Sequence, residues 1–222
     1  RDVLGSRGLG DVYKRQPPKL TAHTGMDAMT HAIEAYVSTL HCNYTDPLAL
    51  HAIKLIHENL KKSYDGDMAA RDTMHDAQCL AGMAFSNALL GIVHSMAHKT
   101  GAAYSGGHII HGAANAMYLP KVIKFNARNA EAAGRYAEIA RFIDLPGSTT
   151  EELVDALIAE LRKMNKELNI PYAIQNYGEG GVIAEQSIID EKEFNEKLSE
   201  VAKNAIADAC TCLLYTSPSP RD

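Results

Sequence analysis

The sequence predicts an all-α fold in which many helices form one domain. Apolar residues recur at intervals of three and four along most of the chain, as they do on one face of a helix. No segment alternates apolar and polar residues as a half-buried strand does. Turn residues separate the periodic segments, and no repeat or interdomain linker interrupts them. A many-helix bundle satisfies all three observations.

Capping residues place the first two helices. The first is expected over 25–40, where the Thr24 hydroxyl can cap the start. The second is expected over 46–64, with Asp46 as N-cap and Pro47 at the first helical position, where a proline is tolerated. An Asp-Gly-Asp turn follows it.

The middle of the chain predicts a long helix and an interior helix. Residues 68–90 are rich in Ala and Met and are expected to form one helix. Residues 91–104 are apolar nearly all round, which is typical of a helix in the protein interior. A glycine-rich break at 105–107 ends it. Residues 112–126 form the next helix, kinked or interrupted by Pro120.

The last third predicts three more helices. Residues 129–143 are amphipathic. Ser148 or Thr149 caps a helix that reaches about Leu168, with Glu151 or Glu152 completing a capping box. The remaining elements are a turn at 145–147, a stop at Ile170-Pro171, a loop over 177–182 and a helix over 190–208.

Composition excludes several classes of function. The 222 residues carry 22 Lys+Arg and 27 Asp+Glu, a net charge of −5 without a basic run, so nucleic acid is not an expected partner. No run of 18 apolar residues predicts a membrane span. Four cysteines do not make a disulfide framework, so we expect reduced thiols and a cytoplasmic protein.

The two ends do not fit the helical pattern. Residues 1–16 and 212–222 resemble translated sequencing adaptor and are expected to be artefact. The glycines near residue 8 have the wrong order for a dinucleotide-binding loop. Residues 17–211 are therefore expected to be a truncated domain of a longer parent protein.

Ten histidines without a single tryptophan are the unusual feature of the composition. Asp27 and His31 lie four residues apart on one predicted helix and share a face, and His94 and His98 repeat that spacing on the apolar helix. Buried imidazoles cost stability unless they are bound, and a carboxylate with three imidazoles suits a divalent transition metal. The candidate ligands are Asp27, His31, His94 and either His108 or His111. The other histidines, expected on the solvated surface, are His23, His41, His51, His57 and His75.

Three segments resemble one enzyme family. GMDAMTHAIEAYVS (25–38), GIVHSMAHKTGAAY (91–104) and HGAANAMYLPKVIKFN (111–126) are similar to the iron-dependent (group III) alcohol dehydrogenases. The similarity is strongest to the alcohol dehydrogenase half of bifunctional aldehyde-alcohol dehydrogenases and to butanol dehydrogenases, and it covers nearly all of 17–211. It implies a dehydroquinate synthase-like helical C-terminal domain, preceded in the parent by a dinucleotide domain that nothing here matches.

The resemblance also implies roles for individual residues. Asp27, His31 and His94 match metal ligands of the family, and His98 matches a histidine beside the nicotinamide and the substrate. The final ligand falls on His111 when the His-Gly and Ala-Asn-Ala words are matched. In the family this histidine usually follows the His94 ligand position by fourteen residues, and that count falls on His108, so His108 stays the alternative.

The implied parent is an enzyme that interconverts primary alcohols and aldehydes with NAD(H). Its metal polarises the substrate oxygen, and Fe²⁺ is expected, although the ligand set also suits Zn²⁺. NAD would be bound mainly by the missing domain, so the fragment alone is expected to be inactive. The full-length form is expected to be a homo-oligomer.

Two other classes of function remain open at this point. A helical metallophosphohydrolase also gathers His and Asp on helices, and His75-Asp76 is a ready pair for it. A non-catalytic helical scaffold would bind no divalent ion.

Overall fold

The computed structural model describes residues 16–211, and the expectations for 1–15 and 212–222 lie outside these residues. Over 16–211 the chain is helical, with one isolated antiparallel bridge between Tyr177 and Ile183, which confirms the all-α fold. The elements are α2 (Pro18–Val37), α3 (Thr45–Tyr64), α4 (Met68–Ala88), α5 (Ile92–Thr100), α6 (His111–Asn126), α7 (Ala130–Phe142), α8 (Thr150–Glu167), the 3₁₀ helix η1 (Ile174–Asn176) and α9 (Glu191–Ile206).

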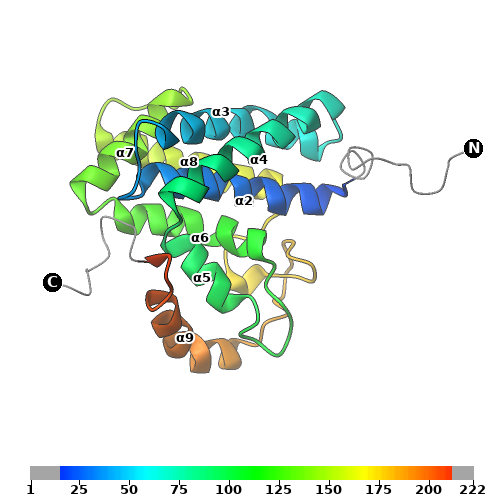
Figure 1. The fold of residues 1–222 in the computed structure, drawn as a ribbon. Helices are drawn as coiled ribbons and strands as arrows, with labels where there is room; N and C mark the ends of the chain where they lie inside the picture. Colours follow the sequence, from blue (N-terminus) through cyan, green and yellow to red (C-terminus); the bar gives the residue numbers. More distant parts are fainter. Residues whose placement is uncertain (1–15, 212–222) are drawn as a thin grey trace, which may run out of the picture.

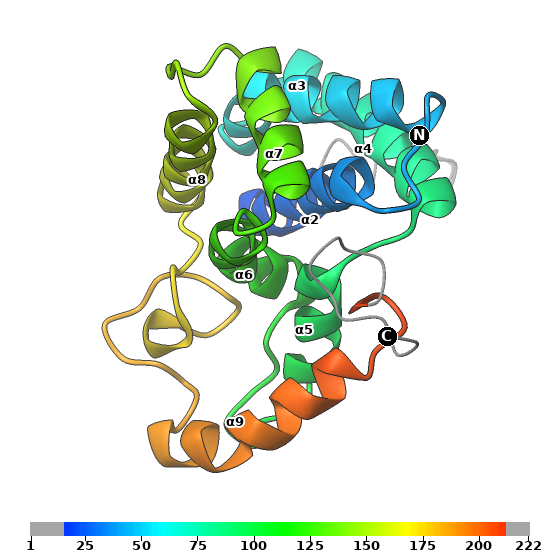
Figure 2. The same cartoon turned by 90° about the vertical axis from the view of Figure 1, so that its left-hand side faces the viewer.

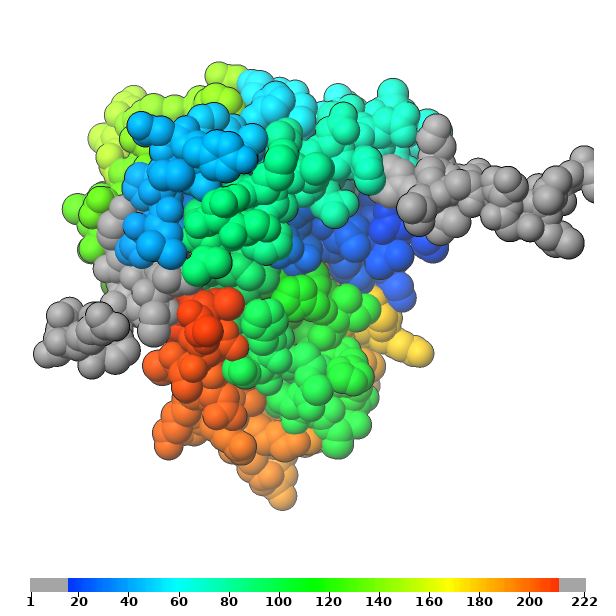
Figure 3. Space-filling view, viewed as in Figure 1, coloured from blue at the N-terminus to red at the C-terminus, as the bar shows by residue number. Residues whose placement is uncertain are grey.

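Helix α2 lies at the centre of the arrangement (Figures 1 and 2). Helices α3 and α4 pack on α2 and on each other. Helix α6 packs on α2 from another side, α8 packs on α6, and α7 packs on α8. Helix α5 packs against α6, and α9 packs against α5 at the edge of the molecule (Figure 3). The centre of the core therefore lies between α2 and its neighbours.

Helix α2 begins earlier than the sequence predicts. Pro18 occupies its first turn, and the buried face extends upstream through Ala22. Thr24 does not cap a helix, because it is a residue of α2 itself, where its hydroxyl donates to the Leu20 carbonyl. Because the apolar stripe continues before Gly25, burial extends the helix through the predicted cap.

Helix α3 also begins before its predicted cap. Its N-cap position is Tyr44, and Asp46 stands in the first turn. The Asp46 carboxylate pairs with Arg135 at 2.9 Å and with His41 at 3.1 Å. The tertiary ion pair therefore replaces the predicted capping bond.

The segment 89–110 departs most from the predicted pattern. Helices α4 and α5 meet at an angle of 102°, and Leu89 takes a positive φ of 62° at the break. Helix α5 ends at Thr100, and turns replace the predicted helix up to Tyr104. One side of α5 reaches the surface, since 40% of the His98 side chain is exposed, so the helix is not interior all round.

The predicted capping box of Thr149 and Glu152 at the start of α8 is confirmed. The last helix, α9, begins directly after Asp190, whose side chain caps it. Pro120 lies inside the continuous helix α6, so the expectation that it interrupts this helix is wrong. No single helix within 16–211 is long and apolar enough to cross a bilayer, and only the bent pair α4–α5 reaches that composition when both are taken together.

Two glycines allow the helices to approach closely. A Cβ at Gly25 would lie 2.2 Å from Leu60 Cδ1 of α3. A Cβ at Gly112 would lie 2.2 Å from the His23 carbonyl oxygen, which belongs to the backbone of α2 and cannot rotate away. Gly112 therefore sets how near the start of α6 comes to α2.

We predict that Gly112→Ala destabilises the fold by about 1–3 kcal/mol, because the added methyl group forces α6 away from α2. Gly134→Ala is the matched control, since a Cβ there meets nothing within 4 Å and the alanine favours helix α7. Thermal unfolding followed by circular dichroism measures both. A Gly112 variant as stable as the Gly134 variant would show that the close approach is unimportant.

Candidate metal centre

Four side chains from three helices gather around the Asp27 carboxylate. Asp27 and His31 come from α2, His94 from α5 and His111 from α6. The Asp27 Oδ1 lies 3.7 Å from His94 Nε2 and 3.4 Å from His111 Nε2, and Asp27 Oδ2 lies 3.8 Å from His31 Nδ1. One potential ligand atom from each of Asp27, His31 and His94 lies within 4.8 Å of the others.

Local structure explains this convergence. Asp27 and His31 are one turn apart and project from the same side of α2. The sharp bend between α4 and α5 brings His94, in the first turn of α5, back toward them. His111 is the first residue of α6, and the close approach at Gly112 brings its ring to Asp27.

A second carboxylate, Glu34, orients His94. It lies seven residues after Asp27, so both occupy the same side of α2. Glu34 Oε2 lies 2.6 Å from His94 Nδ1 and accepts the Gly91 amide, and Oε1 accepts the Val93 amide. The carboxylate thus caps α5 and directs the opposite ring nitrogen, Nε2, toward Asp27.

This Nε2 is one of the buried polar atoms without a hydrogen-bond partner in the described part of the chain. The His94 side chain is 1% exposed, and Nε2 finds no hydrogen-bond partner among residues 16–211. Buried ring nitrogens are ordinarily paired, so an unpaired one facing a carboxylate is typical of a metal ligand. The donor set of three imidazoles and one carboxylate suits a divalent transition metal.

Asn115 orients the other side of the cluster. Its side-chain nitrogen donates to Asp27 Oδ1 at 2.6 Å and lies 3.1 Å from His111 Nε2. Asn115 stands one turn after His111 on α6, so both share a face. The Asn115 amide therefore holds the Asp27 and His111 side chains close to each other.

Aromatic stacking fixes the ring planes. His31 stacks between Phe85 at 4.3 Å and His94 at 4.4 Å, measured between ring centroids. His111 stacks on His98 at 5.3 Å and lies 5.5 Å from His94. These contacts reduce the conformational freedom that a metal ion would otherwise have to remove.

The protonation states also favour a cation. Burial would raise the pKa of Asp27, but the neighbouring His94 ring and the charge of His31 outweigh it, and the pKa falls to about 2. Burial lowers the pKa of His31 to about 4 and also lowers the pKa of His111. Burial would lower the pKa of His94 too, but the neighbouring carboxylates of Asp27 and Glu34 raise it to about 9. At neutral pH Asp27 is charged and His31 and His111 are free to bind, whereas His94 releases a proton when a metal binds.

The structure places the two alternatives for the final ligand differently. His111 reaches Asp27, as described above, whereas His108 is exposed and its Nδ1 bonds the Gly101 carbonyl at 2.8 Å. His98 lies at the edge of the cluster, with its centroid 6.2 Å from that of His94 and its Nδ1 3.7 Å from Asp208 Oδ2.

The prediction of a solvated surface is wrong for His23. The longer α2 carries it into the interior, where 3% of the residue is exposed and Nε2 lies 3.0 Å from the Gly181 carbonyl oxygen. His41 and His57 are partly buried beside acids, Asp46 and Glu160 respectively, each at 3.1 Å. His51 and His75 are exposed, as predicted.

The sequence reasoning missed Glu34 and Asn115. Each carried a detectable signal: Glu34 is a carboxylate among apolar residues on the side of α2 that holds Asp27, and Asn115 follows His111 by one helical turn. A polar side chain one or two turns from a ligand on an otherwise apolar face is a marker of a supporting residue.

Comparison with known proteins identifies the family. A model of the Fe-containing alcohol dehydrogenase family, C-terminal, matches residues 21–222. The NADPH-dependent butanol dehydrogenase of Clostridium saccharobutylicum is 57% identical over 201 residues, covering 90% of this chain and 48% of the relative. The bifunctional aldehyde-alcohol dehydrogenase AdhE of Escherichia coli K12 is 38% identical, covering 88% of this chain and 22% of the relative.

Solved structures agree with these relatives. The alcohol dehydrogenase of Oenococcus oeni superposes with a TM-score of 0.79 at 33% identity, covering 92% of this chain and 49% of that chain. The iron-containing alcohol dehydrogenase of Thermococcus thioreducens gives 0.77 at 32% identity, covering 94% and 49%. The chain thus spans about half the length of these single-function relatives. These matches support neither the phosphohydrolase nor the scaffold interpretation, and the chain belongs to the Fe-containing alcohol dehydrogenase family, as its C-terminal helical domain.

Proposed function

We propose that Asp27, His31, His94 and His111 hold a divalent metal ion, and that the domain supplies this ion to an alcohol dehydrogenase reaction. The observation that supports the proposal is the buried His94 Nε2, which faces Asp27 without a hydrogen-bond partner within 16–211. Fe²⁺ is the proposed ion, because the related structures are iron-containing enzymes and the ligand set suits it. Zn²⁺ is the competing ion for the same four ligands.

The chemistry requires charge stabilisation at an oxygen atom. When bound, a divalent ion acts as a Lewis acid that favours the alkoxide form of an alcohol and polarises an aldehyde carbonyl. One carboxylate against two positive charges leaves a net positive site that attracts an anionic oxygen. Glu34 and Asn115 hold His94 and Asp27 in place, so the ligands are oriented before the substrate arrives.

We propose that His98 moves a proton beside the substrate and contacts the nicotinamide. Its ring stacks on His111, and 40% of its side chain is open to solvent at the edge of the cluster. With Nδ1 directed toward Asp208, Nε2 is the atom left to exchange a proton with a substrate oxygen.

The proposal for the activity of the whole protein involves residues outside this chain. We propose that it interconverts primary alcohols and aldehydes, with a nicotinamide dinucleotide bound mainly by residues outside this chain. The family resemblance favours NAD, whereas the Clostridium saccharobutylicum relative is named NADPH-dependent, so NADPH is the dinucleotide to test first.

We predict that the 222-residue chain binds one Co²⁺ ion, used as a coloured substitute for Fe²⁺. His94→Ala should weaken binding more than 100-fold because it removes a ligand, whereas His98→Ala should leave it unchanged. Glu34→Gln should weaken binding about 10–100-fold, since it removes the carboxylate that orients His94. Absorption titration under nitrogen measures all three.

The matched control is His51→Ala, which removes an exposed imidazole in the second turn of α3 and should not alter binding. Equal affinity of the His94 and His98 variants for Co²⁺ would contradict the assigned roles. Weaker binding in His108→Ala than in His111→Ala would reverse the choice of the final ligand.

We predict that a chimera restores activity. Residues 17–211 would replace the matching segment of the Clostridium saccharobutylicum enzyme, whose other half supplies the dinucleotide site. The chimera should oxidise NADPH with butyraldehyde, and His98→Ala should lower kcat about 10²–10⁴-fold at full metal content, as for loss of a proton-transfer group.

Two controls accompany the chimera. The 222-residue chain alone should not oxidise NADPH, and p-nitrophenyl phosphate should not be hydrolysed. A metal-loaded chimera that folds but reduces no aldehyde, or a chain that hydrolyses the phosphoester, would refute the proposed reaction.

A further inference from the structure

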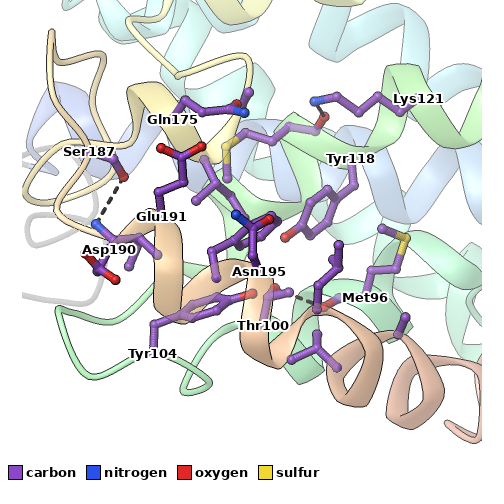
Figure 4. A pocket seen from close by; sticks show the side chains of 18 of the residues that line it. Met96, Thr100, Tyr104, Tyr118, Lys121, Gln175, Ser187, Asp190, Glu191 and Asn195 are labelled. Carbon is purple, nitrogen blue, oxygen red and sulfur yellow. Dashed lines mark hydrogen bonds between the residues drawn. The ribbon is translucent and has the colours of Figure 1, made fainter.

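A cavity of about 620 Å³ lies on the other side of α5 from the metal centre. Met96 and Thr100 line it, and each stands two residues from His94 or His98, about 200° around the helix. Helices α6 and α9 and the segment around η1 complete the wall (Figure 4). The cavity is therefore separate from the cluster of Asp27.

Helix α9 turns an apolar stripe toward this cavity. Phe194, Leu198, Val201 and Ala205 follow one another at intervals of three and four and all line it. Of the α9 side chains only Ala205 is buried, and 46% of Leu198 is exposed. An amphipathic helix normally packs its apolar stripe against a core. Here the stripe of α9 borders an unfilled cavity instead.

The Tyr104 hydroxyl is an unpartnered polar group in the wall. Only 6% of Tyr104 is exposed, and its oxygen finds no hydrogen-bond partner in the described part of the chain. Its ring is held by Phe194, with the ring centroids 5.7 Å apart. In Figure 4 the hydroxyls of Tyr104 and Tyr118 enter the cavity from different elements. A buried hydroxyl without a partner is costly, and a ligand oxygen would relieve that cost.

Both phenols are uncharged at physiological pH. Burial raises the pKa of Tyr104, and the charge of Glu193 raises it further. Burial raises the pKa of Tyr118 to about 12. Each hydroxyl can therefore donate a hydrogen bond to an acceptor placed between them.

The charged residues of the wall are engaged elsewhere or exposed. Lys121 Nζ donates to the backbone carbonyls of Met117 and Tyr172, and the Asp190 carboxylate accepts the Glu193 amide that it caps. Glu191 is exposed at the rim. Lys121, Asp190 and Glu191 together carry a net charge of −1, so the wall gives an anion no net attraction. The largely apolar interior would also strip hydration from any charged group, which favours an uncharged ligand.

We propose that this cavity binds an uncharged, largely apolar small molecule that presents a hydrogen-bond acceptor to the Tyr104 hydroxyl. Its volume lies within the range of about 300–1,000 Å³ usual for small-molecule sites. The site does not depend on the metal ion or on the alcohol dehydrogenase reaction.

A matched pair of probes tests the ligand class. 2-Acetonaphthone carries a carbonyl acceptor on an apolar body, and 2-naphthoate is an anion of the same size. Calorimetric titration of the 222-residue chain should show one saturable site for the ketone and at least tenfold weaker binding of the anion. Absence of saturable ketone binding, or equal binding of the two probes, overturns the proposal.

Two variants locate the site. Tyr104→Phe should weaken ketone binding about twofold to tenfold, the loss of one hydrogen bond, without lowering Tm, because it removes an unsatisfied hydroxyl. Val201→Phe should fill the space and abolish ketone binding while Co²⁺ binding is retained. Tyr44→Phe, at a tyrosine that is 61% exposed and does not line the cavity, is the control. Ketone binding unchanged in Val201→Phe, or a lower Tm in Tyr104→Phe, contradicts the assignment.

Discussion

The bond between Glu34 and His94 is the interaction on which the proposed metal centre depends. It joins α2 to α5, the helix that follows the 102° bend after α4, and it lies where water is excluded, since both side chains are at most 4% exposed. The same carboxylate accepts two backbone amides at the start of α5, so one group both caps a helix and orients a ring. A carboxylate in such a position would be costly alone, and these three partners offset that cost.

Close packing of backbones brings the remaining ligands to this pair. Helix α6 can carry His111 to Asp27 because Gly112 has no side chain to meet the backbone of α2. Small residues are frequent among the buried positions of both helices, including Ala22, Ala28 and Ala113. The short distances between ligand atoms therefore also depend on the small residues beside the ligands.

Local signals in the sequence predicted the helices and their order, because turn residues and capping residues act over a few positions. The capping box of Thr149 and Glu152 is the clearest success. Errors arose where distant contacts decide. Asp46 pairs with Arg135 and does not cap α3, and the burial of His23 depends on Gly181, far along the chain. The cluster itself was foreseen from spacing and family resemblance, but the roles of Glu34 and Asn115 needed the fold.

One face of the metal centre is open. About 42% of the His111 side chain and 23% of Asp27 are exposed, while His94 is almost fully enclosed. An ion entering by that face would meet His111 and Asp27 first and the rigid His94 last. Covering this face after an ion has bound would make the ion slow to exchange with chelators. The exposed imidazole thus gives the centre an entrance whose closure sets metal retention, separately from intrinsic affinity.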